Sequence, residues 1–187
     1  MDELEKKLAQ RFDPMLIDAE LDRAMYRLIF KRLEKARNPK VKKYFTAKVD
    51  LQNFIILLRA RAMGKDAAFF ERLMLPCGSI PLSEFQKGFD DPDRLVKLLK
   101  PYGEKVLRAG LQCAADAGKL PLMEKTADDY LYGLFSGTRY QTASIEVLIA
   151  YLLRAQREAT DVRLIMAGKL NGFKPEELEE RVRELHG

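Results

Sequence analysis

Apolar residues recur at steps of three and four along most of the chain, which is the spacing of one face of an α-helix. Between positions 17 and 28 this face consists of Ile17, Leu21, Ala24 and Leu28. Longer patterns of the same kind predict helices over about 40–63 and about 144–170. No segment shows the sustained apolar–polar alternation of a half-buried strand. The pattern therefore predicts an all-α fold with no sheet.

Breaks rich in proline and glycine divide the rest of the chain into shorter helices. We expect these over 2–11, 65–73, 82–89, 91–99, 104–117 and 122–136, with a terminal helix from 174 onward. Asp91 is expected to cap its helix, with Pro92 in the first turn. Residues 75–81 are predicted to form a loop. The first half of the helix over 144–170 is apolar on almost every side, so it is predicted to be deeply buried.

Each long helix carries a polar stripe, and the two stripes match when the chain is shifted by 108 positions. Because each residue advances about 100° around a helix, a stripe spans only about 80°. The residues are Asp50, Asn53, Arg61 and Gly64 in the first stripe, and Glu158, Asp161, Lys169 and Gly172 in the second. A repeat of this size predicts two tandem pseudo-repeated helical bundles with a period of about 108 residues, over 1–100 and 101–187.

The stripe has two interpretations. It is either a structural seam between each long helix and its neighbours, or an interface with another protein chain. The seam is favoured, because polar side chains of a helix usually find partners within their own fold. Buried acids are costly without partners, and Arg23, Arg27 or backbone N–H groups are candidates. If the stripe is a seam, Asp50→Ala and Glu158→Ala are both expected to lower thermal stability.

Charge changes this picture little. The 187 residues include 33% charged side chains and carry a net charge of +5. The densest basic cluster runs from Lys31 to Lys43, but it contains Glu34 and lies on a predicted pair of helices. Such charge is typical of a solvated face. We therefore do not expect nucleic acid among the partners. A helical domain that binds nucleic acid stays open as a less favoured hypothesis. A salt-dependent gel shift with nucleic acid would test it.

The sequence offers little for catalysis or for metal binding. Its two cysteines, Cys77 and Cys113, are far apart, and its one histidine is His186. These residues cannot assemble an ordinary zinc site. Neither a Gly-x-Ser-x-Gly elbow nor a Walker-type phosphate loop occurs. We expect no catalytic residues, no metal site and no cofactor.

The sequence predicts a cytoplasmic protein that does not enter the bilayer. The N-terminal residues are charged and lack the apolar core of a signal peptide. The longest apolar run, 147–153, is far shorter than the ~20 residues that span a bilayer. Any association with a membrane is therefore expected to run through another protein.

The C-terminal segment resembles a known family. Residues 145–178 are similar to the C-terminal signature of the C subunit of the V-type and archaeal-type ATP synthases, the counterpart of the d subunit of eukaryotic V-ATPases. The first long helix resembles another repeated helix of this family, and residues 75–78 resemble its Leu-Pro-Gly-Gly loop. Cys77 stands where the family has its first glycine, and Val147 where it has proline. The matching C-terminal positions are Glu146, Ala150, Tyr151, Glu158, Arg163, Gly168, Lys169, Leu170, Asn171 and Gly172.

The resemblance implies a non-catalytic part of a rotary motor. Family members resemble a funnel on the cytoplasmic face of the membrane rotor ring, which receives the central stalk and couples ATP hydrolysis to proton or sodium transport. The implied partners are the rotor-ring membrane subunit and the central-stalk subunits. Members of the family resemble a stack of three helical repeats, whereas this chain holds two. The resemblance implies that the repeat without a counterpart here is the N-terminal one.

A generic helical-repeat adaptor that binds another protein is the alternative interpretation. Such an adaptor would share the stiff helical scaffold but none of the rotary partners. Co-purification with proteins of the ring or stalk distinguishes the two.

Overall fold

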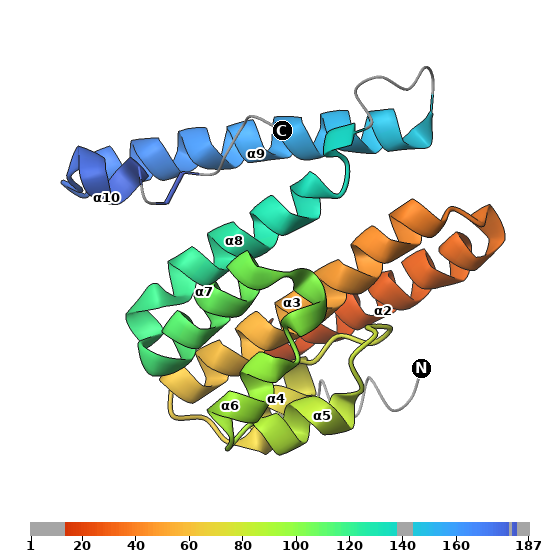
Figure 1. Ribbon diagram of the computed structural model, residues 1–187, viewed down its shortest axis with the longest axis horizontal. Helices are drawn as coiled ribbons and strands as arrows, with labels where there is room; N and C mark the ends of the chain where they lie inside the picture. Colours follow the sequence, from red (N-terminus) through yellow and green to blue (C-terminus); the bar gives the residue numbers. More distant parts are fainter. Residues whose placement is uncertain (1–13, 138–143, 180, 183–187) are drawn as a thin grey trace.

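The computed structural model describes residues 14–137, 144–179 and 181–182. In these ranges the secondary structure is entirely helical, without a strand, and the predicted all-α fold is confirmed. The helix expected over 2–11 lies outside the described residues. Figure 1 shows α2 and α3 side by side, the short helices α4 to α6 at one end of α3, and α9 along the edge of the molecule, next to the end of α8. The helices are α2 (Pro14–Ala36), α3 (Pro39–Ala62), α4 (Ala67–Leu73), α5 (Leu82–Gly88), α6 (Pro92–Lys97), α7 (Glu104–Ala115), α8 (Leu120–Gly133), α9 (Ile145–Leu170) and α10 (Pro175–Glu179), with 3₁₀ turns η1 (Lys100–Tyr102) and η2 (Ala117–Lys119).

Local sequence signals account for the helix boundaries. The Asn38 side chain caps α3 by accepting a hydrogen bond from Val41 N at 3.0 Å, and Pro39 occupies the first turn. Asp91 caps α6 in the same way, as predicted, by accepting from Arg94 N at 3.0 Å. Capping of this kind satisfies backbone donors that have no partner within the helix.

The hydrophobic core surrounds α3. Phe54 and Leu57 of this helix have no exposed surface, and they belong to one cluster with Phe70, Leu99 and Met123. The cluster thus joins residues before and after position 100. The division of the chain into bundles over 1–100 and 101–187 stays a prediction.

Helix α9 lies along one edge of the molecule, and Figure 1 shows its C-terminal end, together with α10, extending beyond α8. Ile145, Leu148 and Leu152 are each more than half exposed, so the prediction that the first half of this helix is deeply buried was wrong. The sequence shows that α9 has apolar residues on several sides. It does not show that only one of these sides packs against other described residues.

Candidate functional site

The first polar stripe meets the loop that follows α4. Asp50, in the middle of α3, has no exposed surface. Its carboxylate accepts hydrogen bonds from Ser79 N at 2.9 Å, from Ile80 N at 3.1 Å, and from the Ser79 and Tyr102 hydroxyls. Four donors around one buried carboxylate compensate for the loss of its hydration. Asp50 therefore fixes a loop and the turn η1 to the centre of the longest core helix.

Asn53 holds the start of the same loop. It is 2% exposed, and its side-chain amide donates to Leu75 O at 3.0 Å and accepts from Leu75 N at 2.8 Å. An amide side chain presents a donor and an acceptor together, so it satisfies both backbone groups of one residue. Asp50 and Asn53 thus bind mostly backbone groups. Backbone N–H groups were among the expected partners of the stripe, as was Arg27, which does not bind these two residues.

The loop passes very close to α3. A Cβ atom on Gly78 would lie 2.1 Å from Asp50 Oδ1 and 3.2 Å from Val49 Cγ1, so only glycine fits there. The neighbouring Cys77 has a φ of 74°, in the left-handed region that glycine adopts without strain. The family resemblance placed a glycine at this position, and the backbone geometry gives the physical reason.

Arg23 secures the loop from the other side. From α2 its guanidinium donates to Met74 O at 3.0 Å and to Glu71 O at 2.8 Å, and it pairs with Glu20. Tyr26 of the same helix packs in a small cluster with Val49 and Leu75. Three elements, α2, α3 and the loop, are thus joined through one set of polar and apolar contacts.

Tyr102 serves as a permanent donor to Asp50. Burial raises the pKa of its phenol above the ordinary value of 10.0, and the hydrogen bond to Asp50 raises it further. A raised pKa keeps the hydroxyl protonated through the physiological range. The Tyr102 hydroxyl therefore keeps its proton and its hydrogen bond to Asp50, and this contact is structural.

The second stripe does not form the same contacts. Glu158 is exposed and pairs with Arg154 at 3.0 Å, Lys169 is exposed, and Asp161 is buried. The loop that the 108-residue shift would set against this stripe falls at 183–187, outside the described residues. In the first stripe, Arg61 is only partly buried. The structure therefore brings Asp50 and Asn53 together at one loop and leaves Glu158 and Lys169 at the surface.

The two stripes do share their helix ends. Gly64 has a φ of 64° and Gly172 a φ of 74°. Gly64 N donates to Arg61 O, and Gly172 N donates to Lys169 O. Such left-handed glycines satisfy carbonyl groups at the end of a helix and turn the chain sharply. The period of about 108 residues stays a prediction, supported here by two equivalent turns.

Sequence reasoning missed Arg157, which fixes α9 to α8. This buried side chain donates to Asp128 O at 3.2 Å, pairs with Asp129, and lies 4.5 Å from the ring centre of Tyr132. It projects from the side of α9 opposite to the exposed apolar residues. Asp128 and Asp129 are acidic residues, which commonly bind a cationic side chain. The sequence does not indicate that this side chain is Arg157, because only the fold brings the two segments together.

Within the described ranges, the site has the properties of a scaffold. No group of three or more histidine, cysteine, aspartate or glutamate side chains there has the arrangement of a metal site. No helix in those ranges is both long and apolar enough to span a membrane. What the arrangement provides is a polar seam that fixes short elements to a long helix.

Comparison with known proteins gives a consistent result. The family model described as ATP synthase (C/AC39) subunit matches residues 1–181. The C subunit of an A-type ATP synthase from Thermococcus gammatolerans is 25% identical over 88% of this chain and 47% of its own length. The C subunit of a V-type sodium ATPase from Enterococcus hirae is 27% identical over 79% of this chain and 45% of its own length.

The match covers the chain more fully than it covers the relatives. The C subunit of a further A-type ATP synthase, from Desulfurococcus sp., is 25% identical over 98% of this chain and 50% of its own length. This chain thus spans about half the length of the curated relatives that it matches. No solved structure matches it. Because the family model covers nearly every residue, the chain belongs to the ATP synthase (C/AC39) subunit family.

Proposed function

We propose that this protein is a non-catalytic connector of a rotary A-type or V-type ATPase, which links the central stalk to the membrane rotor ring. The observation that carries the proposal is the family match over residues 1–181. In this role the protein is a peripheral component on the cytoplasmic side of the membrane. It touches the rotor-ring membrane subunit and the central-stalk subunits, and it passes torque that supports proton or sodium transport.

The construction of the fold suits a part that carries load. Helix α9 has 26 residues, which corresponds to about 39 Å of rigid rod. Around α3, the buried contacts of Asp50 and Asn53 fix the loop over 75–80 to the helix. Densely packed interiors have low compressibility and transmit strain. A connector needs this stiffness, and it does not need a nucleophile.

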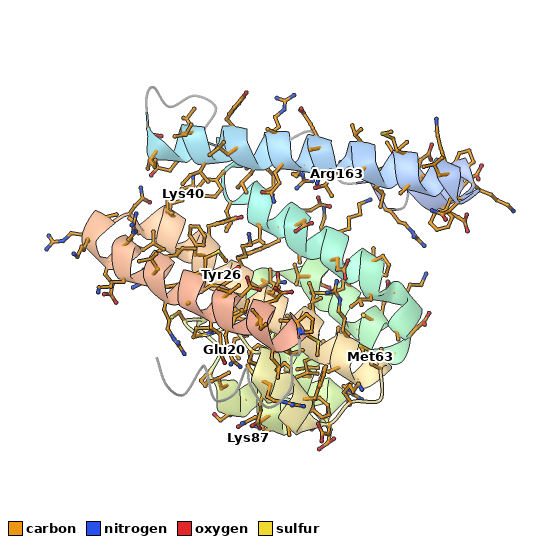
Figure 2. All side chains as sticks on the ribbon, turned by 180° about the vertical axis from the view of Figure 1, so that it is seen from behind. Glu20, Tyr26, Lys40, Met63, Lys87 and Arg163 are labelled. Carbon is orange, nitrogen blue, oxygen red and sulfur yellow. The ribbon has the colours of Figure 1, made fainter. Side chains whose placement is uncertain are left out.

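The distribution of charge supports a contact between one end of the molecule and an acidic partner. Residues 27–43, at the turn of the α2–α3 hairpin, contain eight basic residues and one acid, Glu34, although the whole chain has a net charge of only +5. Seven of these eight basic residues are exposed, and Figure 2 labels the eighth, Lys40, at the start of α3. A concentrated charge of one sign steers an oppositely charged partner and fixes its orientation. We assign this basic hairpin to an acidic surface of the stalk or ring.

Co-purification from membranes tests the connector role. The tagged chain is expressed in its own host, membranes are solubilised in mild detergent, and captured proteins are identified by mass spectrometry. The expected result is enrichment of the rotor-ring protein and of stalk proteins over a tag-only control. If neither is captured while the chain is folded by circular dichroism, the connector role is wrong.

A charge-reversal pair tests the assignment of the hairpin separately. Lys31→Glu with Lys35→Glu is expected to reduce the captured amount severalfold at low salt, with a smaller difference at high salt. Lys105→Glu with Lys119→Glu changes the net charge equally at exposed sites elsewhere, and it is expected to leave capture unchanged. Equal losses from both pairs would attribute the effect to net charge and not to the hairpin.

A further inference from the structure

The exposed side of α9 carries an uninterrupted apolar seam. Its members alternate in steps of three and four, which is the heptad spacing of a coiled coil. Leu152 is 56% exposed, Val162 55% and Met166 61%, although such side chains are usually buried. The seam consists of Ile145, Leu148, Leu152, Ala155, Ala159, Val162 and Met166, all of which are exposed.

The contacts of α9 within the chain lie on the other side of the helix. Relative to Leu148, the positions of Arg157, Asp161 and Gly168 are turned by about 180–220°. Arg157 binds α8, and Gly168 packs so closely under α10 that a Cβ atom there would lie 2.3 Å from Leu178 Cδ2. Among the described residues, the contacts of α9 with the body and with α10 therefore leave the seam exposed, so that another helix can pack on it.

The seam has the composition of a close helix pair. Leucine, isoleucine, valine and methionine at its two ends would bury apolar area, and the two alanines in its centre allow the backbones to approach. A strict spacing of 3.5 residues keeps such a seam facing its partner over several turns when the two helices supercoil. A single solvent-exposed helix face would not require this regularity.

The flanking charges select the partner and its direction. Glu158 and Arg163 lie on opposite flanks of the seam, five residues apart. When two copies of α9 run parallel and in register, an acid on one flank of one helix meets the residue five positions later on the facing flank of the other. Glu158 of each copy then lies beside Arg163 of its partner, twice per pair. Figure 2 labels Arg163 on α9.

The present partner of Glu158 does not prevent this contact. Its ion pair with Arg154 is formed between side chains that are about half exposed, at i and i+4. Exposed pairs of this kind contribute little. The carboxylate can therefore contact both Arg154 and an Arg163 from a second chain.

We propose that two copies of this chain associate through a parallel, in-register pairing of their α9 helices along the heptad seam. The occupant of the seam is thus a second copy of the same chain. The inference depends on α9 alone and is independent of the connector role, so the two proposals can fail separately.

Mass measurement in solution tests the association. By size-exclusion chromatography with light scattering, the purified chain is expected to show about twice its 21.5 kDa mass. Val162→Lys, which sets two charges into the seam, is expected to give the monomer mass. Leu21→Lys alters an equally exposed apolar residue on α2 and is expected to leave the dimer intact. A monomeric parent at roughly 100 μM, well above the Kd of a stable pair, overturns the proposal.

Cysteine cross-linking tests the direction. In a Cys77→Gly background, Met166→Cys is expected to form a disulfide-linked dimer under mild oxidation, because position 166 lies at one end of the seam and faces itself only in the parallel register. Arg154→Cys, turned away from the seam, is the matched control and is expected to stay uncross-linked. A dimer in which Met166→Cys does not cross-link overturns the parallel register.

Charge exchange tests the flanking pairs. Glu158→Arg or Arg163→Glu alone removes both ion pairs of the dimer and is expected to raise the dimer Kd roughly two- to thirtyfold, from about 0.2–1 kcal/mol for each exposed pair. The double exchange is expected to restore the parent Kd. If the double variant dimerises as poorly as the worse single variant, Glu158 and Arg163 do not meet across the pair. Association of the seam with a different protein while the parent stays monomeric also contradicts the proposal.

Discussion

Asp50 joins three elements of this fold, namely α3, the loop after α4 and η1. Its carboxylate accepts from two backbone N–H groups and two hydroxyls, contributed by the loop after α4 and by η1. Removal of a buried acceptor leaves each of these donors without a partner, which costs more than the loss of the bonds themselves. At this scale Asp50 and Asn53 of the polar stripe bind groups of their own chain, and the role of the whole stripe stays a prediction.

The two acids that open the two stripes are expected to respond differently to truncation. Asp50→Ala leaves buried donors unsatisfied, so it is expected to lower the free energy of unfolding by about 2–4 kcal/mol. Glu158→Ala removes only an exposed pair with Arg154 and is expected to change it by less than about 0.5 kcal/mol. Urea denaturation followed by circular dichroism measures both. Equal effects would show that Glu158 also holds its stripe to a neighbouring element, as the sequence alone led us to expect.

Cys77 offers a stabilising substitution. Its φ of 74° is costly for a residue with a Cβ atom, and glycine adopts it freely. Cys77→Gly is therefore expected to raise the free energy of unfolding by about 0.5–1 kcal/mol, the strain relief exceeding the greater freedom of glycine in the unfolded chain. Cys77→Ala keeps the Cβ and serves as the control, with no expected gain. A loss of stability in the glycine variant would show that the thiol itself makes a contact that outweighs the strain.

At the scale of helices, the attachment of α9 depends on few contacts. Apart from α10, which lies at its own C-terminal end, the described contacts of α9 with the body include the Arg157 contacts with α8 and the bond from Asn38 Nδ2 to Glu146 Oε1, at 2.6 Å. Ile149, Ala150 and Leu153 add partly buried apolar contacts with the core. The Asn38 bond also lowers the pKa of Glu146. A long helix with such sparse anchoring is expected to open locally before the core around α3 does.

Arg157→Ala is expected to loosen α9 selectively. The change removes the ion pair with Asp129 and the stacking on Tyr132, and the expected cost is about 1–3 kcal/mol. Hydrogen exchange followed by mass spectrometry is expected to show faster exchange in α9 and unchanged exchange in α3. Arg154→Ala, on the same helix at an exposed position, is the control and is expected to leave both rates near those of the parent. Faster exchange in α3 as well would show that α9 is part of the same cooperative unit.

The sequence predicted the helices better than it predicted their neighbours. Apolar spacing located the two long helices, and the polar and glycine residues at their ends, such as Asn38 and Gly64, mark the observed boundaries. These are local properties, which the spacing of residues encodes directly. The burial of α9 was mispredicted, because an apolar side chain does not report whether an element elsewhere in the chain covers it. The partners of Asp50 were hidden for the same reason, since Ser79 and Tyr102 are brought to it only by the fold.

At the scale of the whole molecule, the core around α3 contains ionisable groups that are buried in their neutral forms. Burial raises the pKa of the Cys113 thiol to about 11 from 9.0 and that of the Tyr44 phenol to about 12 from 10.0, with smaller contributions from nearby acids. Burial also raises the pKa of Tyr102. Each group binds its proton more tightly in the folded chain than in the unfolded chain. The free energy of unfolding therefore depends on pH in the alkaline range.

The protein is expected to lose stability as the pH rises from about 9 to about 12. In this window the unfolded chain releases protons from Cys113 and Tyr44 that the folded chain retains, so the free energy of unfolding falls with pH. The contribution is fully present below pH 9, where both states are protonated. Urea midpoints measured at intervals across this range give the slope directly. Cys113→Ala removes one of the groups and is expected to flatten the slope between pH 9 and 11. An unchanged slope in Cys113→Ala would show that the thiol does not titrate differently in the two states, and the alkaline loss would then belong to the tyrosines of the same core.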